Sequence, residues 1–400
     1  MITVKVALAS EIVRSCASEL ERCGVSVNEA TLIALFIFTE RALGPRSKYG
    51  TYLNSLPQVG SGALFFGANE LDLLEATPLA KAAEAKQRQL SKQFDCFLDV
   101  LHDWFARQNI AGTIAFNDYK WAHFIVLSRA ISLASFAADG NDESFTFGED
   151  YDRALLPVLD MFNHSGGSSS VRWVVENNHS VTVSICAEAA KRAPKVDIDG
   201  VAHVELCLSY GEKPNTEWLY EYGFIPRNNA HRAWPYLIGL AGSSELVSVK
   251  LLWMQELGLL PRIMMQDLAE HGQAHDISRE TILALCLEAL DDTLDPCSAD
   301  VACRVVPAFP YFSINGDLLV DDEDKLLAVP GLVAHALSQC ISRLEGARRT
   351  MLSNARASAE ASAEVSASVH DYLVSEAELL SRIIPQLKNR IRATSIPEFT

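Results

Sequence analysis

Two segments of the sequence, about fifty residues apart, bring together side chains that can take part in catalysis. The first is Asp160-Met161-Phe162-Asn163-His164-Ser165, and the second contains Ser209-Tyr210-Gly211 followed by Tyr222-Gly223-Phe224. An imidazole and two phenols can orient a substrate or move a proton. Each motif alone is weak evidence for a catalytic site. An isolated histidine is more often a hydrogen-bonded core residue, and an isolated Ser-Tyr-Gly is more often the end of a strand. The information lies in their combination.

Two other kinds of chemistry are poorly supported. A hydrolase that uses His164 with a serine nucleophile lacks the Gly-x-Ser-x-Gly elbow typical of such enzymes. The nine cysteines include no Cys-x-x-Cys pair, which disfavours a zinc cluster, and nothing indicates a disulfide framework. We therefore expect no metal site and interpret the cysteines as reduced and mostly buried.

Together with their flanks, the two segments resemble the C-terminal half of a SET domain of the Rubisco large-subunit methyltransferase type. The agreement covers Leu156 to Ser165 and Glu205 to Phe224, with Asn215 in its expected place. This family transfers a methyl group from S-adenosylmethionine (SAM) to a protein side chain, usually lysine. The resemblance therefore implies a SAM-dependent protein methyltransferase.

Methyl transfer to lysine places particular demands on a site. With an ordinary pKa near 10.4, only roughly one lysine in a few thousand is neutral at pH 7, a cost of about 4 to 5 kcal/mol. An apolar channel beside a sulfonium cation lowers that pKa through desolvation and like charge. Such a site needs aromatic walls, carbonyl oxygens and one phenol, and alignment supplies much of the remaining acceleration.

The resemblance assigns a role to individual residues. Tyr210 occupies the catalytic tyrosine position, where its hydroxyl would orient the amine and the methyl group. Tyr222 matches an aromatic residue of the target-side channel, and Phe224 follows it. Asn163 and His164 match the pair whose backbone groups hold the adenine.

Two further residues belong to the implied cofactor site, which also includes Tyr210. Asp160 begins the turn that presents the Asn-His pair. Ser128-Arg129 matches a Ser-Arg whose arginine approaches the cofactor carboxylate in relatives, although a two-residue match is a weaker signal.

The resemblance extends over nearly the whole chain. The segment from Phe38 to Pro57 resembles a helical insert in the SET fold, and Glu70 to Leu79 matches the insert's next signature. After Pro235 the chain resembles, more loosely, a C-terminal helical domain that holds protein substrates, with Glu376 to Leu387 as the clearest agreement.

One departure concerns the cofactor. Family members open with a strand pair whose Gly-x-Gly turn packs against SAM, whereas Met1 to Val13 matches the segment just after it. Gly60-Ser61-Gly62 lies inside the helical insert, where we expect only a loop, and a lone Gly-x-Gly is weak evidence. Either the sequence is truncated, or the protein lacks half of its cofactor cradle and binds SAM weakly or not at all.

We predict an α+β protein of two domains. Residues 1–235 form an N-terminally incomplete SET domain, with a helical insert at about 25–135 and the mostly antiparallel C-terminal half of the SET core at about 145–235. Residues 236–400 form an all-α domain. The resemblance also implies a knot-like crossing between the segment near Asn163 and the strand that ends near Tyr210.

Local patterns predict individual elements. Asn28 caps a helix that Gly44-Pro45 ends. Further helices are expected from Tyr49 to Pro57, from Asn69 to Leu101, from Trp121 to Phe136 and from Glu376 to Arg392, with a helix or a loop from Asn354 to Ser368. Alternating residues predict strands at 171–175 and 180–185.

Three hypotheses follow for function. The first is transfer to lysine in a non-histone protein, because the chain lacks the cysteine-rich flanks of zinc-bearing histone enzymes. A protein substrate would then bind the C-terminal helical domain. The alternatives are a histidine target and a catalytically inactive SET scaffold that binds a partner through its C-terminal helices.

Charge and hydropathy limit the partners. With 34 Lys+Arg against 51 Asp+Glu, the net charge of −17 argues against nucleic-acid binding through phosphates and fits either a basic protein partner or simple solubility. The acidic run Asp321–Asp324 is better explained as a solvated loop. The longest apolar run, Leu32 to Phe38, is far shorter than the roughly 18 residues of a membrane span. We expect a cytoplasmic or nuclear monomer, with organelle targeting left open if the sequence is truncated.

Overall fold

The computed structural model describes eleven ranges of the chain, and within them the backbone divides into two compact units. The described ranges are 1–110, 114–132, 153–165, 169–176, 180–191, 195–199, 201–256, 258–267, 277–290, 332–360 and 367–394. The first unit comprises Met1–Gly67, Ala82–Lys213 and Glu217–Asn229, and the second comprises Ala68–Lys81, Pro214–Thr216 and Ala230–Thr400. The predicted acidic loop at 321–324 lies outside the described residues. The domain border near residue 235 stays a prediction.

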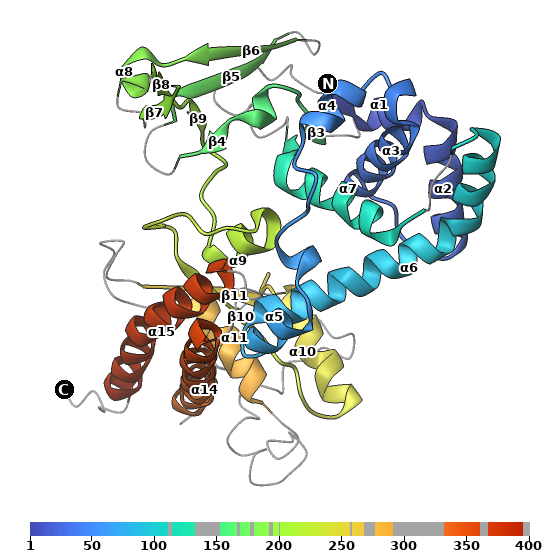
Figure 1. Ribbon diagram of the computed structural model, residues 1–400. Coiled ribbons are helices and arrows are strands. Elements are labelled where there is room, and N and C mark those ends of the chain that lie inside the picture. Colours follow the sequence, from blue (N-terminus) through green and yellow to red (C-terminus); the bar gives the residue numbers. More distant parts are fainter. Residues whose placement is uncertain are drawn as a thin grey trace. The chain divides into compact units, whose positions relative to one another are not determined.

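Helices form most of the first unit (Figure 1). Asn28 caps the central helix α3, because its Oδ1 accepts a hydrogen bond from the Thr31 backbone nitrogen at 2.9 Å. Gly44, with a φ of 55°, ends this helix, so the predicted cap and end are both confirmed. The helices of this unit are α1 (Val4–Leu8), α2 (Glu11–Arg22), α3 (Glu29–Leu43), α4 (Gly50–Ser55), most of α6 (Pro78–Arg107), and α7 (Phe116–Arg129).

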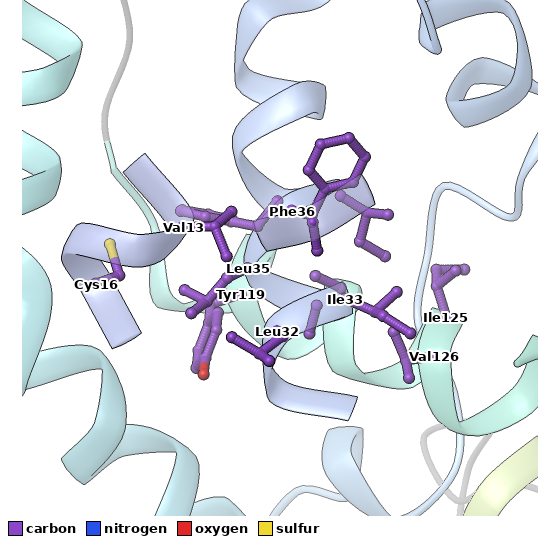
Figure 2. Packing of buried hydrophobic residues seen from close by; sticks show 14 of the residues in the cluster. Val13, Cys16, Leu32, Ile33, Leu35, Phe36, Tyr119, Ile125 and Val126 are labelled. Carbon is purple, nitrogen blue, oxygen red and sulfur yellow. The ribbon is translucent and has the colours of Figure 1, made fainter. Parts of the chain in front are cut away.

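The core of the first unit is built around α3 (Figure 2). This helix is apolar on all sides, and Ile33, Leu35 and Ile37 are fully buried, as expected of a helix enclosed by neighbours. Helices α1, α2 and α7 pack against it. The core therefore fixes the position of α7, whose last residue is Arg129.

Small sheets accompany these helices. Strands β1 (Ile2–Thr3), β3 (Arg153–Leu155) and β2 (Ile131–Ser132) form an antiparallel sheet in that order. Strands β5 (Val171–Glu176) and β6 (Ser180–Ile185) pair antiparallel, as do β7 (Lys195–Ile198) and β8 (Val201–Val204). The predicted strands at 171–175 and 180–185 are thereby confirmed, and so is the α+β class with a mostly antiparallel core.

Two segments far apart in the sequence pair in parallel. Strand β4 (Asn163–His164) lies beside β9 (Cys207–Leu208). The resemblance implied a crossing of these two segments, and in the structure they are adjacent strands. Short helices flank the pair: η4 (Leu159–Met161) precedes β4, α8 (Ala187–Ala190) follows β6, and α9 (Asn215–Glu217) and the π-helix η5 (Trp218–Tyr222) follow β9.

Two predicted helices have different bounds in the structure. The helix predicted from Trp121 to Phe136 ends at Arg129, because Ala130 is extended and the next two residues pair with β3. The long helix predicted from Asn69 to Leu101 is two helices, α5 (Ala68–Leu73) and α6. Pro78 starts α6, as expected of a residue that suits the first helical position.

The second unit is mainly helical, which confirms the predicted helical C-terminal region. Its helices are α5, α10 (Ser244–Glu256), α11 (Arg279–Ala289), α14 (Leu332–Glu360) and α15 (Ala367–Thr394). Helix α15 contains the helix predicted from Glu376 to Arg392. The unit also holds an antiparallel strand pair that was not predicted, β10 (Ala233–Leu237) with β11 (Arg262–Gln266). No helix in the described ranges has the length and hydropathy that a membrane span requires.

A buried polar cluster fastens α15 within the second unit. Asn215, from the second sequence motif, donates hydrogen bonds to Ser375 Oγ at 2.9 Å and to Glu376 Oε1 at 3.0 Å. The hydroxyls of Thr216 and Tyr372 lie 3.1 Å apart. Glu376 is fully buried, and this burial raises its pKa to about 7.

The raised pKa of Glu376 makes stability depend on pH. The buried core favours the protonated, neutral form of Glu376. The contribution of this group to the free energy of unfolding is therefore fully present below about pH 4.5 and is lost as the pH rises through about 7. We expect the stability of the wild type relative to Glu376→Gln to fall by roughly 3 kcal/mol between pH 4.5 and pH 8. Urea unfolding of both proteins at several pH values measures this difference. A difference that does not change with pH would contradict the account.

Candidate active site

A cavity of about 380 Å³ lies in the first unit, within the range typical of small-molecule sites. Its walls come from the end of α7, strand β2, the start of β3, helix η4, β5, β9 with the following loop, and η5. Four of the seven site residues predicted from the sequence line it, namely Arg129, Asp160, Tyr210 and Tyr222. Asn163, His164 and Phe224 are outside the lining. The other lining residues are Leu127, Ser128, Ala130, Ile131, Ser132, Arg153, Trp173, Leu208, Ser209, Gly211, Lys213 and Glu221.

The β4–β9 pairing brings the two sequence motifs together. Asn163 lies opposite Cys207, and His164 lies opposite Leu208. The pairing continues as the Ser165 backbone nitrogen donates to Leu208 O at 3.1 Å. The chain therefore leaves β9 directly beside His164 and enters the cavity wall.

His164 holds the backbone of the predicted catalytic tyrosine. Its Nδ1 accepts a hydrogen bond from the Tyr210 backbone nitrogen at 3.2 Å. Burial lowers the pKa of the imidazole, which favours the neutral ring with its proton on Nε2. The structure therefore gives His164 a positioning role.

Tyr210 is held at both ends. Its hydroxyl donates a hydrogen bond of 2.6 Å to the Phe162 carbonyl oxygen. Burial raises the pKa of the phenol, so the hydroxyl stays protonated at neutral pH. A protonated phenol can orient a nucleophile through its oxygen but is not a strong base.

An aromatic cluster backs this wall. Tyr210 stacks on Tyr222 with ring centroids 5.1 Å apart. Trp218 lies at the centre, with its ring 4.4 Å from that of His164, 5.0 Å from that of Tyr222 and 5.5 Å from that of Phe224. Trp218 was not among the site residues predicted from the sequence. Trp218 could have been predicted from its position four residues before Tyr222, since η5 brings both rings into one cluster. Turns of π-helix occur often at functional sites.

The turn before β4 is fixed by two neighbours. Arg129 Nη1 donates to the backbone oxygen of Asp160 at 2.5 Å. The buried Asp160 carboxylate accepts a hydrogen bond from the Tyr52 hydroxyl of α4 through Oδ2, whereas Oδ1 has no partner among the described residues. Burial raises the pKa of Asp160, and Tyr52 and Arg129 oppose this. Tyr52 is a second residue that the sequence analysis did not assign to the site.

Asn163 and a nearby ion pair complete the surroundings. Asn163 Nδ2 donates to Glu205 Oε1 at 2.7 Å. At the cavity wall, Lys213 Nζ lies 3.2 Å from Glu221 Oε2, and burial raises the pKa of Glu221 against the opposing effect of Lys213.

With Arg129 and Arg153, the lining carries three cations and two carboxylates in a strongly acidic chain. In the part of the chain described, no group of three His, Cys, Asp or Glu side chains could hold a metal ion.

The Gly60-Ser61-Gly62 loop supports η5. Ser61 Oγ donates to the Tyr222 backbone oxygen at 3.3 Å. Gly62 has a φ of +71°, and a Cβ there would lie 2.9 Å from Tyr220 O and 3.0 Å from Leu219 O. This loop was expected to be only a connection in the helical insert, yet it sets the end of η5 and thus the position of Tyr222.

Comparison with known proteins identifies the fold. No protein-family model matches the chain. It is 24% identical over 220 residues to an actin-histidine N-methyltransferase of Rhinolophus ferrumequinum and 23% identical to that of Homo sapiens. Each match covers 54% of this chain and 33% of the relative, so it spans about a third of the length of these curated relatives.

Two solved structures are similar over almost the entire chain. The SET domain of LSMT bound to lysine and AdoHcy aligns with a TM-score of 0.62 and 18% identity, covering 98% of this chain and 80% of that one. Rubisco LSMT bound to AdoMet aligns with a TM-score of 0.62 and 16% identity, covering 98% and 81%. The chain has the SET-domain fold of these proteins, and the resemblance drawn from its motifs is confirmed for the fold.

The loop contact yields a prediction with a matched control. In Gly62→Ala the new Cβ lies too close to two carbonyl oxygens, and the positive φ strains the backbone as well. In Gly24→Ala, where φ is +70° and no atom lies within 4 Å of the new Cβ, only the backbone strain remains. We expect Gly24→Ala to cost about 1 kcal/mol and Gly62→Ala about 1 to 3 kcal/mol more. Urea unfolding followed by tryptophan fluorescence measures both. Equal losses would show that the approach to η5 is unimportant.

Proposed function

We propose that this chain is a SAM-dependent protein methyltransferase that transfers a methyl group to a side-chain nitrogen. The observation that carries the proposal is the stacked pair Tyr210 and Tyr222, whose phenols form one wall of the cavity. Burial keeps the Tyr210 hydroxyl protonated, and its hydrogen bond to Phe162 fixes its direction. This arrangement supplies a fixed phenol and aromatic walls, which methyl transfer to nitrogen requires.

The cavity residues fit SAM. The guanidinium groups of Arg129 and Arg153 suit a carboxylate, and Asp160 Oδ1 is a buried acceptor that a ligand donor would satisfy. The faces of Tyr210 and Tyr222 suit a cation. When bound, SAM supplies a methyl group on a positively charged sulfur.

The protein's own residues would prepare the nucleophile. The aromatic residues of the cavity lining, Trp173, Tyr210 and Tyr222, form a surface that removes water from an entering side chain, which lowers the pKa of an amine. Tyr210 would then orient the neutral nitrogen through its hydroxyl oxygen. No strong base is required, since the environment shifts the protonation equilibrium.

Lysine is our proposed target, and histidine is the alternative. Glu221 favours lysine, because its carboxylate on the cavity wall, which already pairs with Lys213, can also attract the ammonium form before its proton is lost. Lysine also occurs in the complex of the structurally similar LSMT SET domain. The names of the curated relatives, which are actin-histidine N-methyltransferases, support the alternative. We place the protein substrate on the C-terminal helical region.

Replacing the phenol separates an enzyme from a catalytically inactive SET scaffold. Tyr210→Phe removes the oriented hydroxyl and keeps the ring stack, so we expect methyl transfer to fall roughly 100-fold with little change in melting temperature. Transfer of labelled methyl groups from SAM into protein extracts measures the rate. Tyr220→Phe is the matched control, because Tyr220 lies on η5 outside the cavity lining. Equal rates in all three proteins would contradict the role of Tyr210, and no transfer by the wild type would favour a binding module.

The pH dependence of transfer distinguishes the two targets. At substrate concentrations far below saturation the rate follows the free substrate, and a free lysine has an ordinary pKa near 10.4, so the rate should keep rising from pH 7 to pH 9. A histidine substrate, with an ordinary pKa near 6.5, should give a rate that levels off above about pH 7. Replacing the labelled substrate residue by arginine completes the test. Transfer that survives the loss of every candidate lysine would exclude the lysine target.

A further inference from the structure

A positively charged groove lies between α14 and α15 in the second unit, where the two helices run side by side (Figure 1). The groove has a volume of about 410 Å³. Its charged lining consists of Arg348 and Arg349 from α14, Lys388 from α15 and one carboxylate, Glu345. Such a local excess of cations is unexpected in a chain with a net charge of −17.

The two guanidinium groups of the groove are available for an anion. Arg348 is half-buried, and its Nε donates to Ala377 O at 3.3 Å, which fixes the side chain. Its terminal nitrogens make no hydrogen bond to a described residue. Arg349 is exposed, makes no hydrogen bond or ion pair among the described residues, and attracts the Glu345 carboxylate only at longer range. Lys388, in contrast, already pairs with Glu345 at 2.7 Å.

A proline adds a backbone acceptor to the same groove. Pro385 lies inside α15 and has no N–H, so the carbonyl of Ser381, four residues earlier, lacks its usual helical partner. Both residues line the groove, next to the apolar side chain of Ile384. The groove thus presents two cations, a backbone carbonyl that lacks its usual helical N–H partner, and an apolar wall.

We propose that this groove binds an acidic segment of a partner protein. Carboxylates of the segment would pair with Arg348 and Arg349, and a backbone N–H would donate to the Ser381 carbonyl. A polypeptide combines these two kinds of group, whereas a nucleic-acid backbone carries phosphates but no N–H donor for the carbonyl. The groove is independent of the methyl-transfer site and would bind whether or not the chain is an enzyme.

Fluorescence polarisation with a labelled decaglutamate peptide tests this surface on the full chain. We expect decaglutamate to bind at 150 mM NaCl, more weakly as salt is added, and decaglutamine not to bind. Arg349→Glu should weaken binding about tenfold. Arg356→Glu, with the same charge change on the same helix, should weaken it less than twofold, because two turns place it about 10 Å away, beyond the screening length at physiological salt. Equal effects of the two substitutions, or no binding, would overturn the proposal.

A second variant tests the backbone contact. Pro385→Ala returns an N–H to the Ser381 carbonyl and strengthens the helix, so a failure to fold does not complicate the result. We expect it to weaken decaglutamate binding at least threefold with no change in net charge. Unchanged affinity, or equally tight binding of a ten-nucleotide single-stranded DNA, would overturn the assignment to a polypeptide.

Discussion

The parallel pairing of β4 with β9 is the interaction on which the candidate site depends. It places Asn163 and His164 beside Cys207 and Leu208, although two hairpins lie between them in the chain. A parallel pair needs such a long connection, and two residues a side give it little strength of its own. The fully buried Ser170 reinforces it, because its hydroxyl accepts from the Cys207 backbone nitrogen at 2.8 Å and its own nitrogen donates to Cys207 O.

The placement of Tyr210 follows from that pairing, and burial shifts the protonation of the surrounding groups. Once β9 lies against β4, the Tyr210 backbone reaches His164 Nδ1 and its hydroxyl reaches Phe162 O. Burial raises the pKa of Tyr210 and Asp160 and lowers that of His164, so each shift favours the neutral form. The site therefore combines the directed hydrogen bonds of Tyr210 and His164 with aromatic faces and with the charged side chains of the cavity lining.

The sequence predicted what local patterns and motifs encode. The cap of α3 at Asn28 follows from side-chain chemistry within three residues, and the motifs located Tyr210 and Tyr222 on one cavity wall. The catalytic and cofactor roles of these residues stay predictions. Contacts across long separations could not be predicted, such as Tyr52 with Asp160, because no local pattern reports which distant residue a phenol meets. The β10–β11 pair was not predicted, because a proline such as Pro235 normally argues against a strand. A strand tolerates proline only where the missing N–H faces away from the partner strand.

The most direct test of the account is titration of SAM, and of its demethylated product, into the purified protein by calorimetry. The account predicts a Kd on the order of micromolar, weakened at least tenfold by Arg129→Ala, which removes both a cation and the anchor of the Asp160 turn. Arg88→Ala, at an exposed position on α6, should bind like the wild type. Failure to bind either ligand, or equal binding by Arg129→Ala and the wild type, would contradict the assignment of this cavity to SAM.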